Sequence, residues 1–185
     1  GVEPDVVTVQ DLLSKGNLNI PAYQRPYKWQ EQHVNQLLDD LILHRDKGRY
    51  RLGTVLLHEH DPEQSNSDAE QIRLNRDLGK KVLDIVDGQQ RLLTITLIGF
   101  LLCQRLREKY SEGRYPFKSP LLEKGFGASV SQANLQHNAA VIQSRLGTLP
   151  IDELDKLLEF LKNSCELVVV TLFKLSEAFQ FVAAA

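Results

Sequence analysis

The chain lacks methionine altogether and has only two cysteines, one tryptophan and no long apolar run among its 185 residues. A membrane-spanning helix needs about 20 consecutive apolar residues, so none is predicted. The acidic, polar first residues also lack the apolar core of a signal peptide. Cys103 and Cys165 form no metal or redox motif, and each lies in an apolar stretch, which predicts buried thiols in a reducing compartment. We therefore expect a cytoplasmic protein with no membrane partner.

The chain also lacks an excess of basic residues. The chain has 22 basic and 24 acidic side chains, for a formal net charge of -2, which argues against a wholly basic nucleic-acid binder. Any contact with DNA must therefore be local. Hydrophobic residues make up 42% of the chain, enough for a substantial core, and one domain over residues 1–185 is expected. Because the chain starts at Gly1 and a new helix begins near Phe181, we expect this domain to come from a longer protein.

The apolar pattern predicts the order of the secondary structure. Helices are predicted over residues 6–13, 31–44, 92–106, 132–146 and 151–161. Strands are predicted over 52–58, 82–86 and 167–173, with an extended segment over 18–21. The polar stretch 59–80 is expected to be a surface loop, in which Ile72 and Leu74 are candidates for an edge strand. This order predicts a mixed α/β (α+β) domain with a small sheet and flanking helices.

The most informative motif is Asp87-Gly88-Gln89-Gln90-Arg91, which lies between a predicted strand and a predicted helix. Helix N-termini expose backbone N–H groups and the positive end of the helix dipole, so they attract anions. Arg91 adds a planar, permanently charged group suited to phosphate. The alternative is a strand-to-helix turn in which Asp87 caps the helix and Gly88 supplies an unusual backbone angle. The local pattern leaves both interpretations open.

A second motif lies between two prolines near the N-terminus. Pro21 and Pro26 hold this stretch extended, and it combines aromatic rings with basic and amide side chains. The candidate residues are Tyr23, Gln24, Arg25, Tyr27 and Trp29. For Tyr27 and Trp29 the residues favour packing onto the core over ligand contact, since aromatic side chains are mostly structural. Gln24 and Arg25 fit a binding role better, because arginine is seldom buried without a partner.

Two other signals are incomplete. Gly79-Lys80 resembles part of a phosphate-binding loop, but neither the first glycine nor the following Ser/Thr of that motif is present. His58 and His60 lie on the same side of a strand, yet no third metal ligand is near them in sequence. We therefore expect these histidines to mark an exposed strand end.

Three segments taken together resemble a known family. Ile20–Trp29, Leu52–Leu57 and Val86–Thr94, in this order and spacing, look like the N-terminal domain of GmrSD-type restriction and phage-defence proteins. The resemblance runs from Val9 to about Gln180 and implies a ParB/sulfiredoxin-like fold with a small mixed sheet. In that fold, a strand, a glycine turn and an arginine-bearing helix start hold nucleotide phosphates.

The resemblance also implies roles for individual residues. Asp87, Gly88, Gln89, Gln90 and Arg91 would form a site that binds and hydrolyses GTP or another nucleoside triphosphate. Asp87 would lie at a Mg²⁺ ion or another divalent cation that accompanies the nucleotide. Either glutamine could position the attacking water, and the residues do not select between them.

The resemblance further implies that the extended segment senses modified double-stranded DNA, such as phosphorothioate DNA. The residues concerned are Tyr23, Gln24, Arg25, Tyr27 and Trp29. Arg25 is also expected to face the nucleotide opposite Arg91. A C-terminal HNH nuclease domain of the same protein is an expected partner, although no HNH signature occurs in these residues. Leu93 stands where the family usually has a second threonine, and the oligomeric state is left open.

The motifs and the resemblance together leave three possible functions for the chain. The leading one is a nucleotide-hydrolysing domain that regulates a modification-dependent DNA nuclease. The second is a non-catalytic reader of modified DNA that uses the same basic and aromatic pocket. The third, a ParB-like nuclease, would need clustered carboxylates for metal ions, and the sequence does not supply them.

Overall fold

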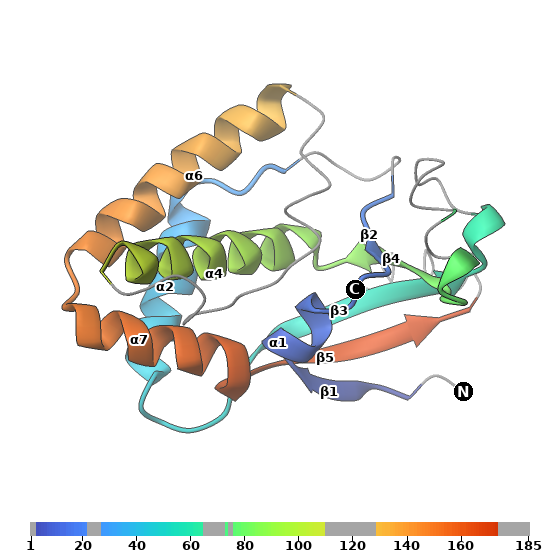
Figure 1. Ribbon diagram of the computed structural model, residues 1–185, viewed down its shortest axis with the longest axis horizontal. Helices are drawn as coiled ribbons and strands as arrows, with labels where there is room; N and C mark the ends of the chain where they lie inside the picture. The colour runs from blue at the N-terminus through green and yellow to red at the C-terminus, as the bar shows by residue number, and fades with distance from the viewer. Residues whose placement is uncertain (1–2, 22–26, 65–72, 74–75, 110–128, 174–185) are drawn as a thin grey trace.

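The computed structural model describes residues 3–21, 27–64, 73, 76–109 and 129–173 of the chain (Figure 1). The strands are β1 (Asp5–Thr8), β2 (Leu18–Asn19), β3 (Tyr50–His60), β4 (Val82–Asp87) and β5 (Cys165–Leu172). The helices are α1 (Val9–Leu13), α2 (Glu31–His44), α4 (Gln89–Lys109), α6 (Ser129–Gly147) and α7 (Ile151–Glu159). A π-helical turn, Phe160–Ser164, joins α7 to β5, and a 3₁₀ turn, Pro62–Gln64, follows β3.

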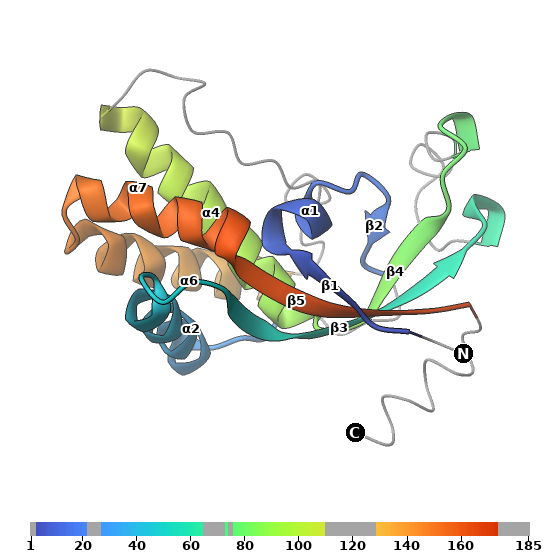
Figure 2. The ribbon, with the colours of Figure 1, turned by 90° about the horizontal axis from the view of Figure 1, so that it is seen from below.

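The five strands form one mixed sheet in the order β1-β5-β3-β4-β2. The pairs β1/β5 and β3/β4 are antiparallel, whereas β3/β5 and β2/β4 are parallel. Figure 2 shows α2, α4, α6 and α7 gathered at one end of this sheet, with α1 against one face. The mixed α/β class expected from the sequence is therefore confirmed. In the described part of the chain no helix is both long and apolar enough to cross a membrane.

The main core lies between the helices and one face of the sheet. Every residue from 92 to 99 of α4 is buried, so the helix predicted over residues 92–106 lies in the core. The strands contribute Val55, Leu57, Ile85 and Leu167 to this core. The opposite face of the sheet carries a smaller apolar cluster of Leu56, Val86, Val170 and Leu172. The sheet is thus apolar on both faces where β3, β4 and β5 adjoin.

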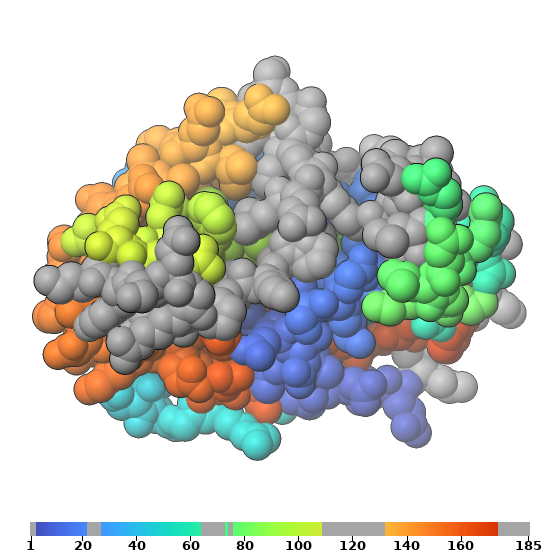
Figure 3. Space-filling model, viewed as in Figure 1, coloured from blue at the N-terminus to red at the C-terminus, as the bar shows by residue number. Residues whose placement is uncertain are grey.

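The N-terminal prediction was wrong in part. Residues 6–8 were expected to begin a helix, but they belong to β1, which pairs with β5, and the helix starts only at Val9. β-branched side chains at Val6, Val7 and Thr8 suit a strand, and the neighbouring β5 provides the backbone partners. Thr8 then caps α1, since its hydroxyl oxygen accepts a hydrogen bond from the backbone N–H of Asp11. Figure 3 shows α1 and β1 (blue) beside α7 and the π-helical turn (orange) on the surface.

Both cysteine thiols are buried, as predicted, and burial raises the pKa of each, so both couple stability to pH. Burial raises the pKa of Cys165 from 9.0 to about 12. The unfolded thiol therefore loses its proton above pH 9 while the folded thiol keeps it. Because the folded pKa is raised, this contribution to stability is complete below pH 9 and is lost as the pH rises toward 12. We expect Cys165→Ala to flatten the fall in unfolding free energy across this range, measured by urea unfolding. An equally steep fall in the variant would contradict the assignment.

Candidate functional site

The turn at Gly88 joins β4 to α4 and brings the helix N-terminus against β3. Gly88 has φ of +96°, a left-handed conformation that favours glycine. Its carbonyl accepts the first helical hydrogen bond, from the backbone N–H of Leu92 at 3.0 Å. A Cβ at Gly88 would lie 3.1 Å from the carbonyl oxygen of Thr54 and 3.4 Å from the Cα of Val55. The turn therefore needs glycine both for its backbone angle and for its closeness to β3.

Arg91 is held by a bulge in β3. The register between β3 and β5 shifts between Arg51 and Gly53, so Leu52 is the extra residue at this bulge. The guanidinium of Arg91 donates a hydrogen bond to the Leu52 carbonyl. Gly53 has φ of +147°, and a Cβ there would overlap the same guanidinium. Two of the three sequence segments thus meet in space, with a glycine in one making room for the arginine of the other.

The other polar residues of the motif make local contacts. Asp87 is exposed, and its Oδ1 accepts a hydrogen bond from the backbone N–H of Gly88 at 3.0 Å. Gln89 is buried, and its Nε2 donates to the Ile85 carbonyl at 2.8 Å. Mg²⁺ takes one or two carboxylates together with water and phosphate oxygens, so the exposed carboxylate of Asp87 fits such an ion. Gln89, in contrast, uses its amide to join the helix to the end of β4.

Gln90 connects α4 to the extended segment. Its Oε1 accepts hydrogen bonds from the backbone N–H groups of Lys28 at 2.7 Å and Trp29 at 3.1 Å. From the other side, Asn134 and Asn138 of α6 donate to the carbonyls of Tyr27 and Trp29 at 3.0 and 2.8 Å, respectively. Residues 27–29 are therefore held between the start of α4 and one side of α6.

The tyrosine of this segment is part of the core. Tyr27 is only 2% exposed, and its hydroxyl lies 2.8 Å from Thr94 Oγ1 and 2.9 Å from Asn138 Nδ2. Burial raises the pKa of Tyr27, and its hydrogen bonds with Thr94 and Asn138 partly offset this shift. These contacts agree with the packing interpretation of Tyr27. Tyr23, Gln24 and Arg25 lie outside the described residues.

A cavity of about 360 Å³ lies beside Arg91, within the size range of small-molecule sites. Its wall includes Trp29, whose ring stacks on His33 with 5.5 Å between ring centroids. The full lining consists of Trp29, Gln32, His33, Gln36, Leu37, Asp40, Tyr50, Leu52 and Arg91. The cavity joins one residue of the extended segment to the cation of the Gly88 turn, with polar side chains of α2 between them. Gln32, Gln36 and Asp40 gave no motif in the sequence, because only the fold brings α2 to this site.

The expectation that His58 and His60 mark an exposed strand end was wrong. His60 is 8% exposed, and its Nε2 lies 2.7 Å from Oδ2 of Asp84. Asp84 faces His58 across the β3/β4 ladder, so it is near in space though distant in sequence. Burial, followed by the neighbouring His60, lowers the pKa of His58.

The comparison with known protein families gives a match that spans the site. A family model described as "GmrSD restriction endonuclease, N-terminal domain" matches residues 9–181. This range includes the extended segment, the β3 bulge and the Gly88 turn. No curated protein matches the sequence.

Proposed function

Because this chain belongs to the family of GmrSD restriction endonuclease N-terminal domains, we propose a nucleotide-dependent function for it. The family is one of restriction and phage-defence proteins. Within that role, we infer that the Gly88 turn binds the phosphates of a nucleoside triphosphate and that the domain hydrolyses it. Hydrolysis would regulate a DNA nuclease carried on a C-terminal domain of the same protein.

The observation that carries this proposal is the contact between Arg91 and the β3 bulge. An arginine is flexible in most surface positions, but here the Leu52 carbonyl and the space left by Gly53 hold its guanidinium beside the helix N-terminus. A fixed cation next to backbone N–H groups gives preorganised stabilisation of negative charge, which is the main requirement of phosphoryl transfer.

The remaining residues would complete the site. Asp87 would hold the divalent cation that accompanies the nucleotide and neutralises phosphate charge. Arg25 is proposed to face the phosphates opposite Arg91. Either Gln89 or Gln90 could orient an attacking water, and the Gln90 Oε1 is fixed at the start of α4 by two backbone hydrogen bonds. Gln89 is buried against β4, so Gln90 is the better candidate for that role.

The residues that line the cavity beside Arg91 favour a guanine nucleotide. Trp29 offers an aromatic surface for a base, and Asp40 offers a carboxylate in the same wall. Guanine has two adjacent N–H donors on its Watson–Crick edge that match a carboxylate, whereas adenine lacks this pair. We therefore propose GTP as the preferred nucleotide.

The test is a titration of the purified protein with GTP and ATP in the presence of Mg²⁺, together with a measurement of phosphate release. We expect the wild type to bind and hydrolyse GTP, and Arg91→Ala to lower the rate of release on the order of 100-fold. Arg105→Ala is the matched control, because Arg105 lies on the same helix in an exposed pair with Glu108. The absence of both binding and release in the wild type would refute the proposal.

A reader of modified DNA is the second candidate. Trp29 is half-buried in the cavity wall next to Arg91, and an aromatic ring beside a cation also suits a modified base or backbone. Nucleotide binding without phosphate release, combined with tighter binding to phosphorothioate DNA than to unmodified DNA, would favour this function.

A further inference from the structure

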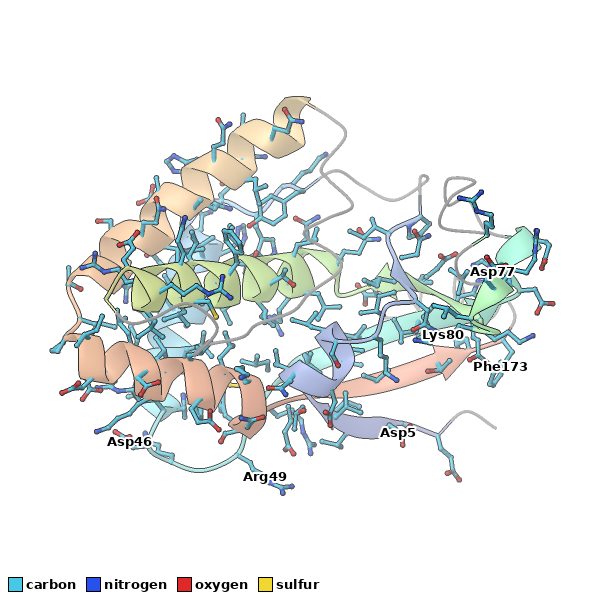
Figure 4. All side chains as sticks on the ribbon, viewed as in Figure 1. Asp5, Asp46, Arg49, Asp77, Lys80 and Phe173 are labelled. Carbon is cyan, nitrogen blue, oxygen red and sulfur yellow. The ribbon has the colours of Figure 1, made fainter. Side chains whose placement is uncertain are left out.

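Three metal-ligand side chains converge at the end of the sheet away from the long helices. His58 and His60 come from β3, and Asp84 comes from β4, directly opposite His58 in the antiparallel ladder. One ligand atom from each side chain lies within 4.8 Å of the other two. Figure 4 labels Phe173 at this end of the sheet, next to the end of β5.

The hydrogen bonds around these side chains resemble those that orient metal ligands. Metal-binding histidines usually donate their second ring nitrogen to a carbonyl or carboxylate, and ligand carboxylates are themselves hydrogen-bonded. His60 Nδ1 lies 2.9 Å from the carbonyl oxygen of Asp61. Asn19 Nδ2 donates to Asp84 Oδ1 at 2.7 Å, which leaves Oδ2 turned toward His60. Hydrogen bonds from neighbouring groups thus orient the side chains of His60 and Asp84.

Either a proton or a metal ion can bridge His60 and Asp84. When neutral His60 donates from Nδ1 to Asp61, its Nε2 presents a lone pair to the carboxylate oxygen of Asp84. Two electron-pair donors then face each other at 2.7 Å, an arrangement that only a proton or a metal ion makes favourable. His58 is adjacent, with 5.1 Å between its ring centroid and that of His60.

We propose that His58, His60 and Asp84 bind a divalent transition-metal ion of the Zn²⁺ class. Two imidazole nitrogens and one carboxylate oxygen form a recognised zinc ligand set, with a fourth position for water. Mg²⁺ prefers oxygen ligands, so this site differs in chemistry from the one proposed at Asp87. Ligand atoms around tetrahedral zinc lie about 3.3 Å apart, so zinc binding would draw the His58 ring toward the pair and open the 2.7 Å contact between His60 and Asp84. The ion would join β3 to β4.

The test is calorimetric titration of the chelator-treated protein with ZnCl₂, with MgCl₂ titrated separately. We expect the wild type to bind one Zn²⁺ at micromolar free metal, to show no matching heat with Mg²⁺, and to melt at a higher temperature with zinc. Asp84→Asn keeps the shape of the side chain but removes the anionic ligand, and should weaken binding on the order of 100-fold. His58→Gln, at a half-buried position, should weaken it similarly.

His137→Gln is the control, because His137 is an exposed histidine on α6 outside the cluster. It should bind zinc as the wild type does. Circular dichroism of each variant without metal verifies folding, and His58→Gln alone carries the test if Asp84→Asn does not fold. The proposal is overturned if the wild type shows no saturable zinc binding, or if His58→Gln and His137→Gln bind zinc equally well. Because no nucleotide is present, the result is independent of the function proposed for the Gly88 turn.

Discussion

Gly88→Ala is expected to lower the free energy of unfolding by about 2–4 kcal/mol, through backbone strain and overpacking together. The residue has φ of +96°, which disfavours any side chain. In addition, the new methyl group would lie 3.1 Å from the Thr54 carbonyl oxygen and 3.2 Å from Cγ2 of Val55. The carbonyl belongs to a central strand and cannot rotate away, so either β3 or the start of α4 must shift. Urea unfolding of the variant measures the loss.

Gly48→Ala separates the two causes. Gly48 has a similar φ of +84°, but a Cβ there meets no atom within 4 Å. This variant should therefore show the cost of the backbone angle alone, roughly 1–2 kcal/mol. The excess in Gly88→Ala is the cost of pushing the turn away from β3. Equal losses in the two variants would show that β3 does not confine the turn.

Gly53 illustrates why the sequence predicted the site only in part. The segment around Gly53 and the segment around Arg91 were each identified, and their order indicated a shared function. Yet the reason for glycine at position 53 is a side chain from another element, which occupies the space of the missing Cβ. Local propensity contains no information about such a contact. The pairing of bulge and arginine therefore became apparent only from the sheet register.

The same limit explains the errors at the sheet ends. Residues 6–8 have a helical spacing of apolar positions, but backbone pairing with β5 determines their structure. Asp84 was assigned to a buried strand, and its carboxylate was not counted as a ligand because 24 residues separate it from His60. In contrast, α4 and β5 were predicted well, because a broad apolar face and an unbroken apolar run each have one favourable environment.

The extended segment shows how a motif rich in binding-type residues can also be structural. Thr94 Oγ1 donates to the Gln90 carbonyl, so the Tyr27 hydroxyl donates to Thr94 and accepts from Asn138. This directed chain of hydrogen bonds crosses from α6 to α4 through one phenol group. It fixes the backbone of residues 27–29 and thereby the position of the Trp29 side chain in the cavity wall. Tyr27 therefore acts on any ligand in that cavity through the position of Trp29.

Tyr27→Ala is consequently expected to lower the free energy of unfolding by about 3–5 kcal/mol, since it removes a fully packed aromatic ring from the core. Tyr27→Phe retains the ring and removes only the hydroxyl, and should cost about 1–3 kcal/mol because Asn138 and Thr94 lose a buried partner. Urea unfolding measures both variants.

Tyr50→Phe is the matched control for the hydroxyl. Tyr50 is held by stacking on His44, with 4.1 Å between ring centroids, and its hydroxyl makes no hydrogen bond to the described residues. The free energy of unfolding should therefore change little, within about 0.5 kcal/mol. If Tyr27→Phe were equally neutral, the hydrogen-bond chain would not hold the segment. Because Tyr27 positions Trp29, Tyr27→Phe should also weaken GTP binding, and a loss of stability with unchanged GTP affinity would show that Tyr27 has a purely structural role.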